Sequence, residues 1–166
     1  MKKIMALLAA TATILSLAAC SFNRELTPEE IAEKESKAIA QSIKAEEYYN
    51  EAHEETVDKL GKTEKGKRLV VQNPDSSGYE YDVYEFDKNQ VLKKRLRYRF
   101  FGTATEYERM LANDKKNNKD IKEADKKSRL IIYNIDFEED PGLTYDFLYE
   151  INSNEGSKAV GIKVIE

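Results

Sequence analysis

Stretches with helical periodicity and stretches with strand periodicity follow one another along the chain. Residues 28–60 begin with a complete helix start signal, in which Thr27 can cap, Pro28 takes the first position and Glu30 completes a capping box. The apolar stripe of this helix is too thin for a strong coiled coil. We therefore predict a helix that stops at Gly61, whose second half packs on a sheet and whose first half is a charged stalk.

Three stretches rich in β-branched and aromatic residues come next, and turn residues separate them. They predict strands over residues 69–72, 79–86 and 90–101, with a hairpin turn at residues 87–89. Because the connections between these strands are short, we expect the strands to pair antiparallel.

A second helix is predicted directly after the third strand. It covers residues 103–114, where Thr105 and Glu108 have the spacing of a capping box. Residues 115–127 are very polar and contain a break at Asn117-Asn118. They predict either a frayed continuation of the helix or a mobile loop.

Three further strands are predicted over residues 129–137, 143–152 and 158–165. The second of these alternates most cleanly, and its apolar positions are Leu143, Tyr145, Phe147, Tyr149 and Ile151. The order of elements predicts an α+β protein. It has a long N-terminal helix, then an antiparallel sheet of about six strands with a second helix between strands three and four.

The first residues have the pattern of a secretory signal peptide. Lys2 and Lys3 precede a mostly apolar run over residues 4–17, which is shorter than the roughly 20 residues of a membrane-spanning helix. The run leads into a motif that resembles the lipobox of bacterial lipoproteins, Leu17-Ala18-Ala19-Cys20. We predict a lipoprotein signal peptide at 1–19, a tether at 20–26, the N-terminal helix at 27–61 and a globular α+β domain at 62–166.

The lipobox resemblance implies recognition of Leu17, Ala18 and Ala19 by the lipoprotein signal peptidase, cleavage after Ala19, and diacylglycerol on the sulfur of Cys20. Two or more acyl chains hold a protein stably on a bilayer, so the expected location is a membrane of the cell envelope. If the cell is Gram-negative, Ser21 after the lipidated cysteine implies the outer membrane.

Charge and cysteine content narrow the range of partners. Loss of Lys2 and Lys3 with the signal peptide changes the formal net charge from −4 to −6. This charge and the compartment argue against nucleic acid as a partner. Cys20 is the only cysteine, so its lipidation leaves none for an internal disulfide. We predict no cofactor.

The order of elements in residues 79–151, where a hairpin with an acidic turn precedes a helix, is loosely similar to that of small periplasmic lipoproteins of the YehR kind. The similarity rests on the pattern of elements and on no motif. It implies an envelope domain of that kind and no particular activity.

Four basic residues share one face of the third predicted strand: Lys93, Arg95, Arg97 and Arg99. They form an anion-binding site under one interpretation. Under the other, favoured interpretation they are paired across the hairpin. A two-residue turn at Lys88-Asn89 places Asp82 opposite Arg95 and Glu80 opposite Arg97, and such pairs are ordinary sheet stabilisation.

The sequence offers little metal chemistry. His53 is the only histidine, and the stretch around it begins like the zinc motif H-E-x-x-H, but Val57 replaces the second histidine. We expect a solvated histidine on the helix. Acids alternate at Asp136, Glu138 and Asp140, but the glycine and the bidentate glutamate of a calcium loop are missing. We therefore predict no metal site.

Two functions remain as hypotheses. The first is a non-enzymatic binding or scaffold module of the envelope, with an envelope protein or a glycan as partner, besides the membrane reached by the lipid on Cys20. The alternative is a carboxylate-dependent envelope hydrolase, which requires a concave pocket with two acids of raised pKa. No motif selects a catalytic residue, so we expect no enzymatic activity.

Overall fold

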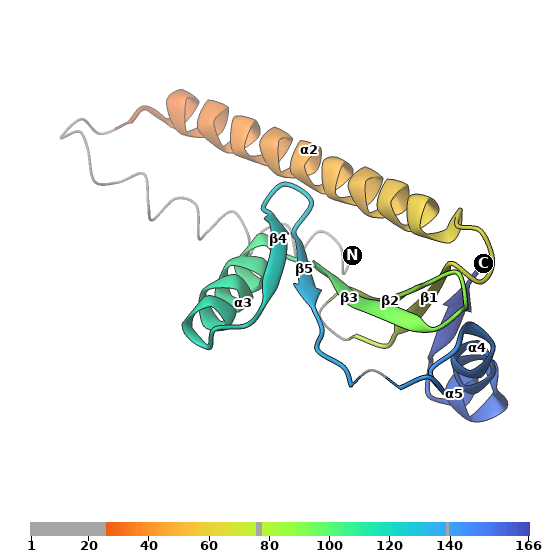
Figure 1. The fold of residues 1–166 in the computed structure, drawn as a ribbon. Helices are drawn as coiled ribbons and strands as arrows, with labels where there is room; N and C mark the ends of the chain where they lie inside the picture. The colour runs from red at the N-terminus through yellow and green to blue at the C-terminus, as the bar shows by residue number, and fades with distance from the viewer. Residues whose placement is uncertain (1–25, 76–77, 139) are drawn as a thin grey trace. The chain divides into compact units, whose positions relative to one another are not determined.

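A computed structural model of the chain describes residues 26–75, 78–138 and 140–166 (Figure 1). The lipobox residues Leu17, Ala18, Ala19 and Cys20 lie outside the described residues. The chain forms two compact units, Met1–Glu47 and Tyr48–Glu166.

The long helix α2 covers Pro28–Gly61, as the sequence predicts. The capping box is also confirmed. The Glu30 N–H donates to Thr27 Oγ1 at 3.3 Å, and the Thr27 N–H donates to the Glu30 carboxylate at 2.8 Å. These two bonds satisfy backbone donors that every helix start leaves without a helical partner.

The two halves of α2 differ in what they bury. Between residues 26 and 47 the apolar side chains of Ile31 and Ile43 stay exposed. From Tyr48 on, α2 belongs to the second unit, where Tyr49 and Leu60 are buried against the sheet. The prediction that the second half packs on the sheet is therefore confirmed.

A six-stranded antiparallel sheet forms the centre of the Tyr48–Glu166 unit, with strand order β4-β5-β3-β2-β1-β6. Its strands are β1 Arg68–Asn73, β2 Gly78–Phe86, β3 Leu92–Phe101, β4 Ile121–Asp125, β5 Leu130–Asn134 and β6 Lys163–Ile165. Helix α3, Ala104–Lys116, lies between β3 and β4 in the chain. This architecture confirms the predicted α+β class.

Apolar clusters cover both faces of the sheet. One face packs on the second half of α2 through Tyr49, Leu60, Val70, Tyr81, Val83, Leu96, Phe100, Leu130 and Ile132. On the opposite face α3 covers the β5 side, and α4, Tyr145–Ser153, covers the β1 side (Figure 1). Because α3 and α4 pack at opposite ends of this second face, the middle strands β2 and β3 carry its polar residues between the two clusters.

The predicted strand over residues 143–152 is wrong, because this segment forms α4. Thr144 caps the helix by accepting a hydrogen bond from the Phe147 N–H at 3.3 Å. Alternate apolar residues on a strand would share one face, whereas here Tyr145 is buried and Phe147 is 47% exposed. Residues four positions apart share a face both in a helix and in a strand. The alternation of apolar residues therefore did not distinguish a helix from a strand here.

The polar segment after α3 is also different from its prediction. The helix ends at Lys116, with Asn118 in the left-handed region at φ 52°, which agrees with the predicted break. Residues 121–125 then form β4 rather than a loop or a frayed helix. This edge strand is mostly exposed and carries charged side chains, as edge strands commonly do. It therefore has no apolar alternation from which a strand could be predicted.

The last predicted strand, 158–165, is shorter than expected. Asn154 caps a short helix, α5, Glu155–Ala159, and Gly161 follows with a φ of 86°. Only β6, Lys163–Ile165, pairs with β1. The predicted capping box of α3 is also misplaced, because Thr103 rather than Thr105 caps the helix and accepts from the Glu106 N–H at 3.2 Å.

Candidate functional site

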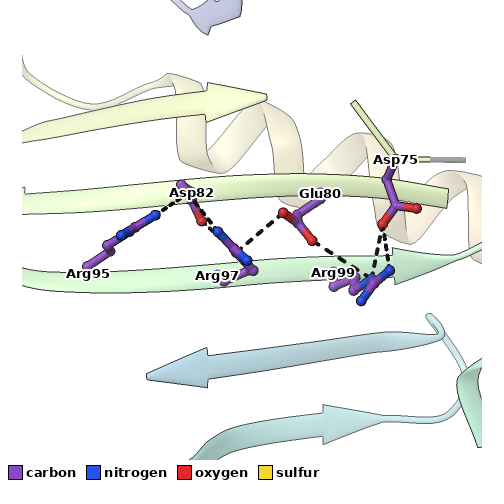
Figure 2. Close-up of polar contacts among 6 residues, drawn as sticks. All are labelled: Asp75, Glu80, Asp82, Arg95, Arg97 and Arg99. Carbon is purple, nitrogen blue, oxygen red and sulfur yellow. Dashed lines mark hydrogen bonds and ion pairs between the residues drawn. The ribbon is translucent and has the colours of Figure 1, made fainter. Parts of the chain in front are cut away.

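A ladder of alternating acids and arginines crosses the middle of the sheet face that α3 and α4 leave between them. We call it the acid–arginine ladder, and its members are Asp75, Glu80, Asp82, Arg95, Arg97 and Arg99 (Figure 2). Three carboxylates and three guanidinium groups balance in charge. The acids come from β2 and from the turn before it, and the arginines come from β3.

The pairing in the ladder is displaced by two residues from its prediction. Asp82 lies opposite Arg97, and Glu80 lies opposite Arg99. Two features each shift the pairing by one residue. First, the hairpin loop has three residues, 88–90, rather than two, because the Asp87 N–H donates to the Val91 carbonyl at 3.0 Å. Second, β3 has a one-residue bulge between the residues that pair with Phe86 and Glu85.

The two displacements together preserve the face of every ladder residue. A shift of one residue would have turned the arginines toward α2, whereas a shift of two returns them to the acids. Lys93 is the extra residue in the bulge, because Leu92 pairs with Phe86 and Lys94 pairs with Glu85. Its side chain is exposed and it stands apart from the regular alternation of the three arginines.

Asp82 is the centre of the ladder and is 3% exposed. It accepts from Arg97 Nε at 2.9 Å and from Arg97 Nη2 at 3.1 Å, and it accepts from Arg95 Nη2 at 2.7 Å. Burial alone would raise the pKa of this carboxyl, but the bonds from Arg97 and Arg95 outweigh burial and hold the pKa below its ordinary value. Asp82 is therefore ionised and bound by two guanidinium groups.

Glu80 and Asp75 continue the ladder at its other end. Glu80 lies 3.4 Å from Arg97 Nε and 3.8 Å from Arg99 Nε, both longer than a good hydrogen bond. Burial raises the pKa of Glu80, and the two arginines offset this only in part. Asp75 accepts from Arg99 at 3.0 Å and was not predicted to take part, since its turn gives no sign of reaching β3.

All three arginines of the predicted basic face thus contact acids. Arg95 also lies over the ring of Tyr84 at 5.4 Å, and Arg99 lies over the ring of Phe101 at 5.2 Å. These contacts agree with the interpretation of the face as a paired ladder.

A polar cavity of about 290 Å³ lies between the ladder and α3, and we call it the ladder pocket. It is lined by Glu80, Arg97, Arg99, Met110, Asn113, Asp114, Lys119, Asp120, Tyr133, Asn134 and Ile135. The lining contains three acids, three bases and two amides, and its surface is more polar than apolar. Its polar groups come from β2, β3, β5, α3 and the turn after α3, so no single sequence motif could have revealed it.

The wall of the ladder pocket near α3 contains a buried hydrogen bond. The Tyr133 hydroxyl donates to Asp114 Oδ2 at 2.7 Å, and these residues are 7% and 6% exposed. Burial and the bond to Asp114 raise the pKa of Tyr133, so the phenol stays protonated and keeps donating. At the rim, the amide of Asn134 donates to the Asp120 carboxylate at 3.0 Å.

On the opposite face of the sheet, His53 contradicts its predicted solvent exposure. Its ring stacks on Tyr79 with centroids 4.1 Å apart and meets the Phe100 ring edge-on at 4.8 Å. Its Nε2 lies 3.0 Å from the Tyr81 hydroxyl. Burial lowers the pKa of His53, and the nearby Glu54 offsets this only in part. His53 lies one helical turn after the buried Tyr49, on the same face of α2. This spacing was the sign in the sequence that His53 packs on the sheet.

In residues 26–75, 78–138 and 140–166, no group of three or more histidine, cysteine or acidic side chains is placed to hold a metal ion. No helix in this part of the chain has both the length and the apolar composition that crossing a bilayer requires.

The chain was compared with models of protein families, with curated proteins and with solved structures. None of the three comparisons finds a match, so the site is defined by its own geometry.

Proposed function

We propose that this protein is a lipid-anchored lipoprotein of the cell envelope whose globular unit is a binding module for a polar, hydroxyl-rich ligand such as an envelope glycan. The observation that carries the binding part is the ladder pocket. It offers carboxylate, guanidinium, ammonium and amide groups side by side in one concavity of about 290 Å³.

The charge balance of the pocket favours this ligand class over an anion. Arg97 and Arg99 already contact ladder acids, so an incoming anion would compete with carboxylates that are part of the fold. A sugar hydroxyl can donate to a carboxylate and accept from an ammonium or amide group at the same time. Lys119, Asp120 and Asn113 at the rim offer both donors and acceptors to such a ligand. None of them belongs to the acid–arginine ladder, so binding there breaks no ion pair of the ladder.

The binding experiment uses the chain from Ser21 to Glu166, which keeps every described residue. Chitotriose and disaccharide–peptides released from peptidoglycan are titrated into labelled protein, and amide shifts are followed by NMR. We expect saturable shifts at Lys119, Asp120 and Asn134. The Lys119→Gln and Asp120→Asn variants are expected to bind roughly five- to ten-fold more weakly, the effect of losing one polar contact.

A matched control is available near the end of α3, four residues before Lys119. Lys115 is exposed, lies outside the ladder pocket and carries the same charge as Lys119. Lys115→Gln is expected to leave both affinities unchanged. Equal loss in the Lys115 and Lys119 variants, or the absence of saturable shifts with either ligand, would count against the binding proposal.

A second candidate function is hydrolysis by carboxylates, and the raised pKa of Glu80 in the ladder pocket favours it. The distance of Glu80 from both arginines leaves its carboxyl less tightly held than that of Asp82. Overnight incubation with the same disaccharide–peptides, followed by chromatography, separates the two functions. New products that disappear in Glu80→Gln would support hydrolysis, whereas unchanged ligand supports binding.

The anchor is supported by the sequence Leu17-Ala18-Ala19-Cys20 and is tested separately. Cells expressing the Cys20→Ser variant are fractionated, and labelled palmitate is added to follow acylation. We expect the variant to lose the label and to remain unprocessed, while the unaltered chain is labelled and sediments with membranes. Equal labelling of both chains would contradict the anchor.

A further inference from the structure

A second cavity, of about 420 Å³, lies at the end of the sheet where β1 begins and β6 ends. We call it the β1–β6 pocket. Its lining is Leu60, Gly61, Thr63, Lys65, Arg68, Leu69, Val70, Tyr145, Tyr149, Val164, Ile165 and Glu166. It shares no residue with the ladder pocket, and its volume falls in the range of roughly 300–1,000 Å³ of small-molecule sites.

One part of the wall of the β1–β6 pocket is apolar. Leu60, Leu69 and Val70 are 5%, 2% and 3% exposed, so they present a firmly packed surface. Beside them, the rings of Tyr145 and Tyr149 stack with centroids 6.0 Å apart and an interplanar angle of 19°. Such a wall favours hydrocarbon or an aromatic ring over water.

The rim of the β1–β6 pocket carries two cations with spare capacity. Arg68 has only long contacts, 3.3 Å to Thr63 Oγ1 and 3.4 Å to Glu85 Oε1, and its Nε is buried with no hydrogen-bond partner among the described residues. Lys65 is exposed and forms no ion pair in the described part of the chain. By contrast, Arg97 in the ladder binds Asp82 at 2.9 and 3.1 Å.

The two Nη groups of Arg68 make only long contacts, so an anion in the cavity can bind them at a shorter distance. A guanidinium group recognises carboxylates and phosphates through several N–H groups. Glu166 is the one acid side chain of the lining, and it accepts a hydrogen bond from the Tyr149 hydroxyl at 2.7 Å. No ion pair joins it to Arg68 or Lys65 in the described part of the chain, so both cations can bind an anion.

We propose that the β1–β6 pocket binds an amphipathic anion, with its carboxylate or phosphate on Arg68 and Lys65 and a short apolar tail against Leu69 and Tyr145. The cationic rim and the apolar wall belong to one cavity, so one molecule can use both. This proposal does not rest on the function proposed for the ladder pocket.

Isothermal titration calorimetry on the Ser21–Glu166 chain tests it with four probes. Decanoate and decyl phosphate carry tail and charge, 1-decanol carries the tail alone, and acetate carries the charge alone. We expect one molecule of decanoate or decyl phosphate to bind per chain, and the other two probes to bind at least roughly ten-fold more weakly. The tighter of the two anions identifies the head group.

Variants locate the binding. Arg68→Gln is expected to weaken decanoate roughly ten-fold, as loss of a charge-assisted hydrogen bond does. Lys65→Gln changes an exposed side chain that the fold does not need, and we expect it to weaken decanoate binding several-fold. The control is Lys158→Gln on α5, outside the pocket lining, which is expected to leave decanoate binding unchanged. No binding of either anion, equal binding of 1-decanol, or equal affinity of Lys65→Gln and Lys158→Gln would overturn the proposal.

Discussion

Arg97 lies directly opposite Asp82 across β3 and β2, and two hydrogen bonds of 2.9 and 3.1 Å join the guanidinium group to the carboxylate. Arg95 binds the same carboxylate from the neighbouring position at 2.7 Å. One buried acid thus binds two arginines, and the stability of the polar centre of this sheet face depends on Asp82.

Replacement of Asp82 by asparagine is expected to lower the free energy of unfolding by about 2–4 kcal/mol. Removing one partner of a buried ion pair costs roughly 3–5 kcal/mol, and the arginines here keep 28% and 33% exposure, which reduces that cost. Urea denaturation at pH 7 provides the measurement. The control is Glu85→Gln, because Glu85 is 34% exposed and has only long ion pairs, so a change within about 1 kcal/mol is expected.

The single histidine provides a specific pH prediction. Burial lowers the pKa of His53 below 6.5, so an NMR titration of its imidazole should give a midpoint below this value. The unfolded chain binds this proton at higher pH than the folded chain does. The contribution of His53 to stability is therefore complete above pH 6.5 and decreases as the pH falls through 6.5 toward the folded pKa.

The control for this pH dependence is His53→Gln. The acids that titrate at low pH, including Glu80 with its raised pKa, are present in both proteins and cancel in the comparison. The drop in unfolding free energy from pH 7.5 to pH 5.5 should be larger in the unaltered protein than in the variant. Identical drops would mean that His53 is as solvated as in the unfolded chain.

The buried bond between Tyr133 and Asp114 predicts a cost for removing one hydroxyl. Tyr133→Phe leaves the Asp114 carboxylate, which is 6% exposed, without this donor, and the expected loss is about 1–3 kcal/mol. Tyr48→Phe is the matched control, since Tyr48 is 44% exposed and its change should stay within about 0.5 kcal/mol. Thermal denaturation of the two variants compares them directly.

Two glycines are expected to respond differently to replacement by alanine. A Cβ on Gly78 would clash with the backbone carbonyl oxygen of Phe100 on β3, so Gly78→Ala should destabilise by about 1–3 kcal/mol. Gly156 lies inside α5, and a Cβ there meets only the Asn154 side chain at 3.4 Å. Gly156→Ala should therefore be neutral or stabilise by about 0.5–1 kcal/mol. Chemical denaturation that ranks the variants in the reverse order would contradict this packing.

Local signals predicted elements well where their causes act over a few residues. The Thr27 and Glu30 side chains bond to backbone groups within a single helical turn, so the start of α2 follows from that sequence alone. The strands of the β2–β3 hairpin bury several apolar residues each, which makes their alternation visible. Edge strand β4 has no fully buried residue, so it shows no such alternation, and its stability comes from pairing with β5.

Sequence patterns alone predicted the α+β class, the ends of α2 to within one residue, and the common face of Asp82, Glu80 and the arginines. These depend on local hydrogen bonds and on side-chain alternation, which a short stretch of chain carries. Three contacts could be seen only in the folded protein: Asp82 binds Arg97, Asp75 binds Arg99, and His53 packs among aromatic rings. Each of these contacts joins residues far apart in the chain, and a loop length, a bulge or the docking of a helix sets the geometry that brings them together.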